Sequence, residues 1–529
     1  MPNACATAWP ARSTTMTTPE PRSVDAAPVA PAPATDTERR LHPMSWLFVL
    51  LQQLKQFIVP LVALLVFGRR SAEGHAGSEL WPLAGVGALV VYSLWQYATY
   101  RYGVHGDSLV VRSGVLHRSL RVIPFARIHN VALQQSLLHR LFGVAEVRLE
   151  SAGGSKPEAE MRVLKLDDAI ALESLVRRRG AAPPAIDAAN EDADDRSQPL
   201  LSLPLGEVLR LGLVSNRGLI VVGAAFAALM QFNRRLIPNL FERWGEALFG
   251  WAGQQHLGPV GYALAALALF ALLAVVLRLL SMLLALTQYH GFRLSEHGRR
   301  LTVERGLLAR WRTSASRRRI QAWTLREGLM HRLLRRRSLE VDTAVAETEN
   351  QQRALREVAP IATPDACAAL IEHLLPKGGW SRLQWHPLPQ RSWWRLFLPT
   401  VPTVMLVASA VGWRFGAWGA LVLLWLPWAA YKARQRAARA AYALGDELVA
   451  VREGWWSRHW RFAEIDKLQA LQLVRSPIDR RCGTASVWLD TAGAGAMSPP
   501  LRIRFLPEAE ARELYDTLSR TLARRPLRW

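Results

Sequence analysis

Long apolar segments recur in pairs along the chain, and each pair is followed by shorter segments in which apolar and polar residues alternate. A helix crosses a bilayer with about 20 consecutive apolar residues. Four segments approach that length without a charged or amide residue in most of their course, at 80–98, 257–277, 393–412 and 415–431. Two more contain polar interruptions, at 46–67 and 208–232. The pattern predicts six transmembrane helices in three hairpins.

The two interrupted segments carry polar side chains inside an apolar run. Lys55 lies in the first, and Asn216 and Arg217 lie in the second. Because a long side chain near the end of a span can reach the headgroups, we expect both segments to cross the membrane with these residues toward one interface. The alternative is an amphipathic helix on the membrane surface that precedes a shorter buried piece.

The stretches that follow the hairpins have the pattern of half-buried strands. Val147 and Leu149 alternate with charged residues, as Ile503 and Phe505 do late in the chain. Each stretch closes with a helix-start signal, for example a threonine cap before proline at Thr363. Several strands followed by one terminal helix predict a small α+β domain after each hairpin.

One motif is written three times in these domains: a glycine, a basic residue thirteen positions later, and an arginine thirteen beyond that. The copies are Gly114, Arg127 and Arg140; Gly306, Arg319 and Arg332; and Gly454, Lys467 and Arg480. Identical spacing in three places indicates an internal repeat. We expect the glycine to permit a tight turn between the first two strands of each copy. The basic residues either bridge strands inside the domain or bind a ligand, and the sequence leaves both roles open.

The first copy is the most informative about the family. It reads Leu-Val-Val-Arg-Ser-Gly-Val-Leu from Leu109, Ile-Pro-Phe-Ala-Arg-Ile-His-Asn-Val from Ile123, and Leu-His-Arg-Leu-Phe-Gly from Leu138. This pattern resembles the bacterial PH-like (bPH2) membrane proteins of the YdbS/YdbT type. The second copy departs from it at Arg335, where the first has Gly143.

The resemblance implies a fold, a location and a kind of partner. Each domain would be a PH-like β-roll with a C-terminal helix, attached to a transmembrane hairpin. Members of the family often accompany a smaller protein with one hairpin and one such domain, so a hetero-complex is expected. The resemblance also implies a role in envelope integrity, and the family has no settled biochemical activity.

These features divide the chain into nine segments. We expect a disordered tail at 1–41, hairpins at 42–100, 207–287 and 392–432, PH-like domains at 101–180, 288–376 and 433–526, and linkers at 181–206 and 377–391. The Lys and Arg near the predicted spans favour the side that holds the domains. The N-terminus and all three domains are therefore expected in the cytoplasm, on an inner-membrane protein.

The formal net charge is +23, and the excess is uneven. Between Arg293 and Ser338 there are fourteen Arg and three Glu. Such a surface beside a span would attract an anionic leaflet, at about 1 kcal/mol for each engaged Lys or Arg. The candidate lipid-facing patch is Arg317, Arg318, Arg335, Arg336 and Arg337. The alternative is a solvated basic face without a specific ligand. Nucleic acid is not expected, because the basic runs lack interleaved aromatic residues.

Catalytic and metal-binding patterns are missing from the sequence. It contains no phosphate-binding loop, no His-Glu-x-x-His, no nucleophile elbow and no Cys-x-x-Cys. The histidines of the first copy have no familiar ligand spacing: His105, His117, His129 and His139. Cys5, Cys367 and Cys482 are scattered, as expected in a reducing compartment. We therefore expect no enzyme, no cofactor and no metal. The expected function is binding of lipid headgroups or partner proteins at the membrane, and the alternative is a transporter or channel component.

Overall fold

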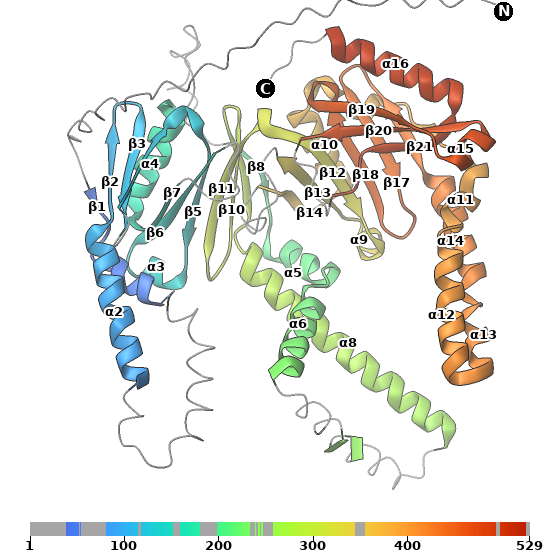
Figure 1. Ribbon diagram of the computed structural model, residues 1–529, viewed down its shortest axis with the longest axis horizontal. Coiled ribbons are helices and arrows are strands. Elements are labelled where there is room, and N and C mark those ends of the chain that lie inside the picture. Colours follow the sequence, from blue (N-terminus) through green and yellow to red (C-terminus); the bar gives the residue numbers. More distant parts are fainter. Residues whose placement is uncertain are drawn as a thin grey trace, which may run out of the picture.

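The computed structural model describes residues 39–51, 53, 81–114, 118–151, 159–179, 198–232, 239, 242–243, 245–246, 258–343, 355–492 and 498–524. Three β-rich modules lie in a row in chain order, and helices extend from one side of that row (Figure 1). We call the modules 1, 2 and 3. Each contains four strands before a short 3-10 turn, then a strand, a short helix, two more strands and a longer helix.

The element bounds follow this plan in each module. Module 1 consists of β1 (Arg39–Arg40), β2 (Arg101–His105), β3 (Ser108–Ser113), β4 (Ser119–Pro124), η1 (Phe125–Arg127), β5 (Ile128–Gln135), α3 (Leu137–Leu141), β6 (Val144–Ser151), β7 (Ala159–Lys165) and α4 (Leu166–Arg179). Module 2 consists of β8 (Gln198–Ser202), β9 (Arg293–His297), β10 (Arg300–Arg305), β11 (Arg310–Ser316), η2 (Arg317–Arg319), β12 (Ile320–Glu327), α9 (Leu329–Leu333), β13 (Arg337–Thr343), β14 (Glu357–Ala362) and α10 (Pro364–Leu374). Module 3 consists of β15 (His386–Pro387), β16 (Ala441–Leu444), β17 (Leu448–Glu453), β18 (Arg458–Glu464), η7 (Ile465–Lys467), β19 (Leu468–Val474), α15 (Pro477–Cys482), β20 (Thr484–Thr491), β21 (Arg502–Pro507) and α16 (Glu508–Arg524).

The first strand of each module precedes its hairpin in the sequence. β1, β8 and β15 pair with β2, β9 and β16, which follow the hairpins. The segment expected as a disordered tail, 1–41, and the two expected as linkers, 181–206 and 377–391, therefore each contain the first strand of the next module. Their Pro-rich composition hid this role, because a strand of two to five residues gives almost no alternation to read.

The sheets cross the module boundaries. Two seven-stranded sheets have the orders β7-β6-β5-β11-β10-β9-β8 and β14-β13-β12-β18-β17-β16-β15. Each combines three strands of one module with four of the next, joined at β5–β11 and at β12–β18. We call these joins junction 1–2 and junction 2–3. The ends of the row carry a four-stranded sheet, β1-β2-β3-β4, and a three-stranded sheet, β19-β20-β21.

The hydrophobic cores follow the modules, with one exception. Leu109, Phe125 and Met161 are among the fully buried side chains of module 1. The core of module 2 also includes Trp460 and Phe462, which belong to β18 of module 3. The boundary between modules 2 and 3 is thus a continuous packed core.

The helices between the first and second strand of each module extend from one side of the row (Figure 1). They are α2 (Trp81–Thr99), α5 (Leu205–Val214), α6 (Arg217–Phe232), α8 (Pro259–Tyr289), α11 (Trp393–Phe397), α12 (Thr400–Phe415), α13 (Gly419–Val422) and α14 (Trp425–Arg439). Short 3-10 turns flank the third set at η3 (Pro376–Gly378), η4 (Trp380–Arg382), η5 (Gln390–Ser392) and η6 (Gly416–Trp418). Most apolar side chains on α6, α8 and α12 are exposed, which requires a lipid or protein cover.

Two helical segments of the described chain are long and apolar enough to cross a membrane, Pro259–Tyr289 and Gln390–Val422. A third candidate is the pair α5 and α6, which is bent by 53°. The expectation of six spans in three hairpins is therefore not confirmed. Most of the predicted span 46–67 lies outside the described residues.

The bend between α5 and α6 explains why segment 208–232 is not one straight helix. The break leaves backbone carbonyls without helical partners, and such groups are costly in lipid. The guanidinium of Arg278, on α8, donates to the carbonyls of Leu213 and Ser215, both at 3.1 Å. It also donates to the amide oxygen of Asn216 at 3.2 Å. The polar residues of the segment thus stabilise a break.

Glycines bring helices close together, for example at Gly212 and Gly419. A Cβ on Gly212 would lie 2.4 Å from the Met282 Cα, so α5 and α8 touch through this glycine. In the third hairpin a Cβ on Gly419 would lie 2.6 Å from the Ala408 carbonyl oxygen. Gly416, with φ +62°, reverses the chain between α12 and α13. Small residues at helix contacts are typical of membrane helices.

Candidate functional site: the junctions

The glycine of the repeated motif forms a turn, as the sequence predicts, but between the third and fourth strands of its module. Gly114, Gly306 and Gly454 have φ of +122°, +115° and +100°, a region that favours glycine. A Cβ on Gly306 would lie 1.9 Å from the Ala309 carbonyl oxygen. The shift by two strands arises because two short strands of each module precede this pair, one before the hairpin (β1, β8, β15) and one after it (β2, β9, β16).

The last arginine of the motif reaches from one module to the next. Arg140, on α3 of module 1, donates to the carbonyl of Leu307 at 3.0 Å. Arg332, on α9 of module 2, donates to the carbonyl of Trp455 at 3.0 Å. Both acceptors directly follow a motif glycine, Gly306 in module 2 and Gly454 in module 3. The motif arginine of one module therefore binds the motif turn of the following module.

The middle residue of the motif closes the 3-10 turn of each module. Lys467 also crosses a junction, because its ammonium donates to the Arg318 carbonyl of module 2 at 2.8 Å. Arg127 is exposed, and burial lowers the pKa of Arg319 to about 10. The third arginine, Arg480, is exposed on α15 of module 3, the last module that the structure describes. The sequence left open bridging of strands inside a domain or binding of a ligand, whereas Arg140, Arg332 and Lys467 bridge one module to another.

The two junctions have the same strand register. Thr313 of β11 lies opposite Ala132 of β5, and Arg461 of β18 lies opposite Thr324 of β12. Counted from the middle motif residue, Thr313 and Arg461 are equivalent, as are Ala132 and Thr324. Junction 1–2 and junction 2–3 are therefore two copies of one backbone arrangement.

Junction 2–3 contains a buried ion pair. Arg461 is 1% exposed and binds the carboxylate of Asp342, on β13 of module 2. Its guanidinium also donates to the Thr324 hydroxyl at 2.8 Å. The Ser498 hydroxyl of module 3 donates to the other oxygen of Asp342 at 2.9 Å. A buried charge needs such partners, so this cluster fixes module 3 against module 2.

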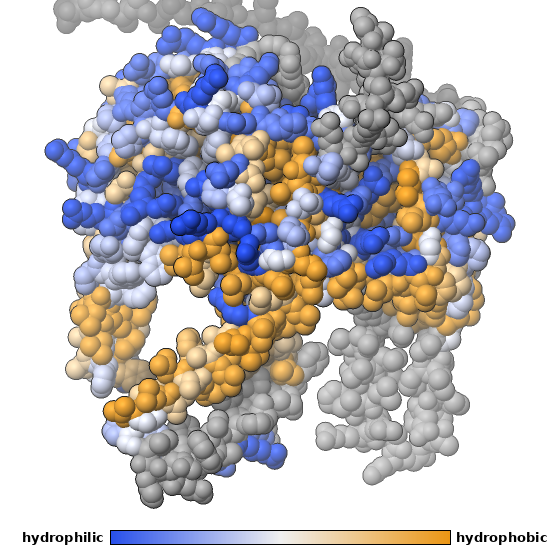
Figure 2. All heavy atoms as spheres, turned by 180° about the vertical axis from the view of Figure 1, so that it is seen from behind, coloured by the Kyte–Doolittle hydropathy of each residue, from blue (hydrophilic) through white to orange (hydrophobic). Residues whose placement is uncertain are grey.

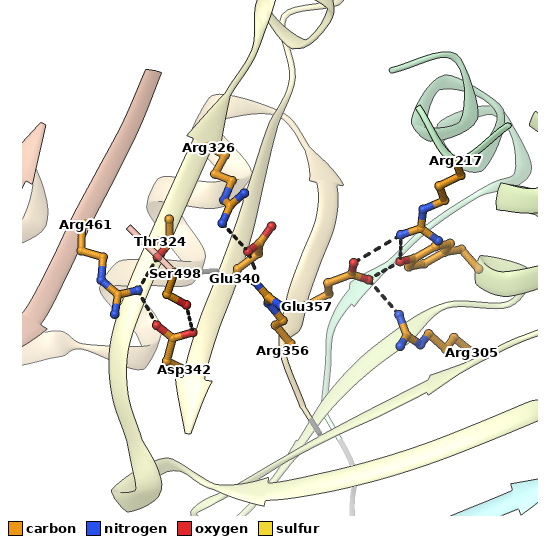
Figure 3. Close-up of polar contacts among 11 residues, drawn as sticks. Arg217, Arg305, Thr324, Arg326, Glu340, Asp342, Arg356, Glu357, Arg461 and Ser498 are labelled. Atoms are coloured by element: carbon orange, nitrogen blue, oxygen red, sulfur yellow. Dashed lines mark hydrogen bonds and ion pairs between the residues drawn. The ribbon is translucent and has the colours of Figure 1, made fainter. Parts of the chain in front are cut away.

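Asp342 is one of three carboxylates that lie along β13 and β14, each beside arginines (Figure 3). Glu340 is 3.2 Å from Arg326 and 3.7 Å from Arg356. Burial raises the pKa of Glu340, and the two arginines partly offset that effect. Glu340 also lines a cavity of about 140 Å³ between α5, α9 and the sheet of module 2.

The third carboxylate, Glu357, connects module 2 to its own hairpin (Figure 3). It is 2.8 Å from Arg305 of β10 and 3.4 Å from Arg217, the first residue of α6. The hydroxyl of Tyr289, the last residue of α8, donates to the same carboxylate. Arg217 is thus paired at the point where the helices meet the module. Lys55, the other charged candidate for a translocation path, lies outside the described residues.

The short helix of every module packs against the start of its own hairpin. In module 1, the His139 ring of α3 lies 4.2 Å from the Phe48 ring. In module 2, Arg336 follows α9 and binds both carboxylate oxygens of Glu207 on α5, at 2.7 and 2.9 Å. The contact between the short helix and the hairpin is thus aromatic in module 1 and ionic in module 2.

Module 3 makes this contact with a buried ion pair. Arg395 of α11 is 2.5 Å from Asp479 of α15, and both side chains are 6% exposed. Burial alone would raise the pKa of Asp479. Hydrogen bonds from Ser476, Arg395 and Thr484 outweigh that effect and lower the pKa to about 2.

The five arginines of the candidate lipid-facing patch lie in two groups. Arg317 binds Glu296 at 2.8 Å and a carbonyl at the end of α10, on the side of module 2 away from the hairpins (Figure 1). The other group, residues 335–337, follows α9 on the hairpin side. Arg336 and Arg337 are bound by Glu207 and Glu327. The exposed members are Arg318 and Arg335.

Metal-ligand geometry does not occur in the described part of the chain, where no group of three or more His, Cys, Asp or Glu could hold an ion. His139 instead packs on Phe48 and its ring nitrogen bonds the Ser136 hydroxyl at 2.6 Å. Cys367 is buried, which raises the pKa of its thiol to about 12, and Cys482 is exposed.

Sequence reasoning missed Asp342 and Arg461 at junction 2–3, and Glu357 between module 2 and its hairpin. Each is a single charged residue in a strand, and such a residue is usually expected to face solvent. A signal was present in β18, where Trp460 and Phe462 flank Arg461. Two large aromatic residues in one short strand are unusual at a solvated edge.

Comparison with known proteins agrees with the three-fold repeat. A family model described as "Bacterial PH domain" matches residues 48–180, 252–373 and 395–522, together well over half of the chain. The UPF0699 transmembrane protein YdbT of Bacillus subtilis (strain 168) is 20% identical over 405 residues, which cover 74% of this chain and 79% of that protein. No solved structure gives a significant match.

Proposed function

The chain belongs to the bacterial PH domain family, and we propose that it is a non-enzymatic inner-membrane protein whose three modules lie on the cytoplasmic leaflet and bind its lipid headgroups. It is a membrane protein with repeated PH-like domains, and it is similar to a protein that is named a transmembrane protein. The proposal adds the surface on which the modules lie and the side of the membrane that they face. The cytoplasmic side rests on the excess of Lys and Arg beside the helices.

The observation that carries the proposal is a set of exposed apolar side chains on the hairpin side of the modules. They belong to the short helices and the motif turns: Leu137, Leu138, Leu141, Leu308, Leu329, Met330, Leu333, Trp456 and Ile478. Figure 2 shows apolar residues gathered along this lower face, below a mostly hydrophilic body. Because the hairpins hold this face toward the bilayer, lipid is the nearest available cover.

Charge and aromatic residues support the same interpretation. Arg335 is exposed directly after α9 and would meet anionic headgroups, at about 1 kcal/mol. Trp455 and Trp456 form a cluster with Trp428 and Tyr431 near the top of the third hairpin. Trp and Tyr are enriched at the level of the headgroups.

Depth measurements in a reconstituted bilayer test the proposal. A nitroxide label at Leu333→Cys would be compared with one at Ala369→Cys, an exposed residue of α10 on the opposite side. The native cysteines would first be replaced. We expect the label at 333 to be accessible to oxygen and shielded from a water-soluble nickel complex, and the label at 369 to behave in the opposite way. Equal exposure of both labels to the nickel complex would overturn the proposal.

Headgroup preference is tested by exchanging the lipid. Anionic bilayers should shield the label at 333 more than zwitterionic ones, and salt should weaken the difference. Arg335→Gln should reduce this lipid dependence, whereas Arg318→Gln on the far side of module 2 should leave it unchanged. If the shielding of the label at 333 does not depend on lipid charge, the modules insert only through their apolar residues. That result would overturn the proposed binding of headgroups.

A further inference from the structure

The two ends of the module row carry the two halves of one more junction. Each internal junction is a seven-stranded sheet of three strands from one module and four from the next. Module 1 begins with a four-stranded sheet whose edge is β4, and module 3 ends with a three-stranded sheet whose edge is β19. β4 is equivalent to β11 and β18, and β19 is equivalent to β5 and β12.

The outer strand of module 1 exposes the positions that the internal junctions bury. Val122 is equivalent to Phe462, counted from the middle motif residue, and is 56% exposed where Phe462 is 0% exposed. Leu120 is 49% exposed, and its equivalent Trp460 is 8% exposed. An edge strand with exposed apolar residues is a surface on which another strand can add.

The outer strand of module 3 is incomplete in the same way. Leu471 and Leu473 are equivalent to Trp323 and Leu325, which are buried at junction 2–3. Both leucines are half-buried, and Gln472 between them is exposed. The core of module 3 is therefore open at the edge where a following module would cover it.

We propose that β4 of one chain pairs with β19 of a second copy, so that chains join head to tail in the register of the internal junctions. That register places Leu120 opposite Leu473 and Val122 opposite Leu471. Cross-strand apolar pairs of this kind stabilise a sheet. The result is a third seven-stranded sheet, made between two molecules.

The charges at the two ends match those at junction 2–3. Arg121 is equivalent to Arg461, and Asp490 is equivalent to Asp342. Both Arg121 and Asp490 are exposed. Head-to-tail pairing would bring them together as the copy of the buried Arg461–Asp342 pair.

The charged residues at the ends of the row and the side on which the helices lie are both compatible with a second copy as the partner. Arg480 is equivalent to Arg140 and Arg332, which cross the internal junctions, and head-to-tail pairing would direct it toward Gly114 of the next chain. The like-charged pair Arg118 and Arg475 falls at the end of the ladder, where Glu508 already binds Arg475 at 2.6 Å. Both internal junctions keep the helices on one side of the row, so a third junction of the same geometry places all chains in one membrane (Figure 1).

Disulfide cross-linking of the full chain in native membranes tests the contact and its register. Ser119 would lie opposite Val474, so Ser119→Cys with Val474→Cys, in a chain without its own cysteines, should give dimers and higher multimers on oxidation. The matched control is Ser119→Cys with Gln469→Cys, which lies five residues out of register on the same strand. Absence of multimers, or equal yields from both pairs, would overturn the proposal. A cross-linked product that contains one chain and a smaller protein would show that the partner is a single-module protein and not a second copy. This result would also overturn the proposal.

Charge reversal tests the proposed ion pair. It also distinguishes a specific contact from cross-links that form when chains meet by chance. Asp490→Lys in the cross-linking chain should reduce the yield of multimers about tenfold, because two positive charges would then face each other. Arg121→Glu added to Asp490→Lys should restore the yield. Failure of the double variant to recover, while circular dichroism shows that it is folded, would overturn the assigned register.

Discussion

Junctions 1–2 and 2–3 share a strand register and a motif contact, yet their side chains differ. At junction 2–3, Arg461 is buried against Asp342, and Trp460 enters the core of module 2. At junction 1–2, the equivalent positions are Thr313 and Arg312, and Arg312 lies at the rim, 3.7 Å from Glu173 of α4. One junction is closed by a buried charge and aromatic packing, and the other by backbone pairing with a polar rim.

The comparison separates what the repeat fixes from what it leaves free. The motif glycine and the last motif arginine set the turn and the contact across the boundary, and both are the same in the two junctions. The residues of the paired strands then vary widely without changing the register. The residues of the motif therefore determine how one module contacts the next. The side chains of the paired strands determine how much each junction contributes to stability.

The largest expected effect comes from the buried pair. Asp342→Ala leaves the Arg461 guanidinium buried without its carboxylate, which costs about 3–5 kcal/mol of unfolding free energy. Denaturant unfolding of the detergent-solubilised protein measures this. Glu173→Ala at junction 1–2 is the control and should cost no more than about 1 kcal/mol, because Arg312 keeps Glu304 at 3.3 Å. Equal losses would contradict the difference between the junctions.

The motif turn should be the next most sensitive point. Gly306→Ala combines a positive φ with a Cβ placed 1.9 Å from the Ala309 carbonyl oxygen, and we expect a loss of about 2–3 kcal/mol. Gly206→Ala, at the start of α5 with no atom within 4 Å of the new Cβ, should be neutral or slightly stabilising. A tolerant Gly306 would show that the turn is not needed for the junction.

The ion pair between module 3 and its hairpin should appear in the pH dependence of stability. The pKa of Asp479 is lowered from 3.8 to about 2, so the folded state favours the carboxylate. Its contribution, about 2 kcal/mol, is complete above pH 4 and is lost as the pH falls through 2. Thermal unfolding across that interval should show a fall that Asp479→Asn lacks. If the unfolding temperatures of both proteins fall in parallel with pH, Asp479 does not contribute to the pH dependence of stability.

The smallest expected effect distinguishes the copies of the motif arginine. Arg332→Met removes one hydrogen bond across junction 2–3 and should cost about 1 kcal/mol. Arg480→Met, at the end of the row, should change the stability of a single chain by less than about 0.5 kcal/mol. A substantial loss with Arg480→Met would indicate a role for this arginine inside module 3.

The repeat and the order of its elements could be predicted because they are local. The alternation near Val147 and the cap at Thr363 each depend on a few neighbouring residues, and β6 and α10 lie where these signals place them. The helix expected at 257–277 is likewise present, although α8 continues to Tyr289. At about 1.5 Å per residue, its 31 residues exceed a bilayer core of roughly 30 Å, and the last part packs under module 2.

The junctions could not be predicted because they join residues that are far apart in the sequence. Arg310 pairs with Gln135, and no local pattern reports such a contact. The acidic partners of two arginines in the basic patch could not be predicted for the same reason. Arg317 and Arg336 have acidic partners, Glu296 and Glu207, that precede them by 21 and 129 residues. Arg335 keeps the left-handed backbone of its equivalent Gly143, with φ of +50°, although it has a side chain.

Hydrogen exchange read by mass spectrometry tests most directly the claim that the modules join through their edge strands. The sample would be the detergent-solubilised full chain with Arg121→Glu, a charge reversal that opposes the proposed pairing of β4 with a second chain. We predict slow exchange for the β11 amides at Arg310–Ser316 and the β18 amides at Arg458–Glu464, and fast exchange for the equivalent β4 amides at Ser119–Pro124. Equally fast exchange in all three strands would show that the modules are independent, and would contradict the account.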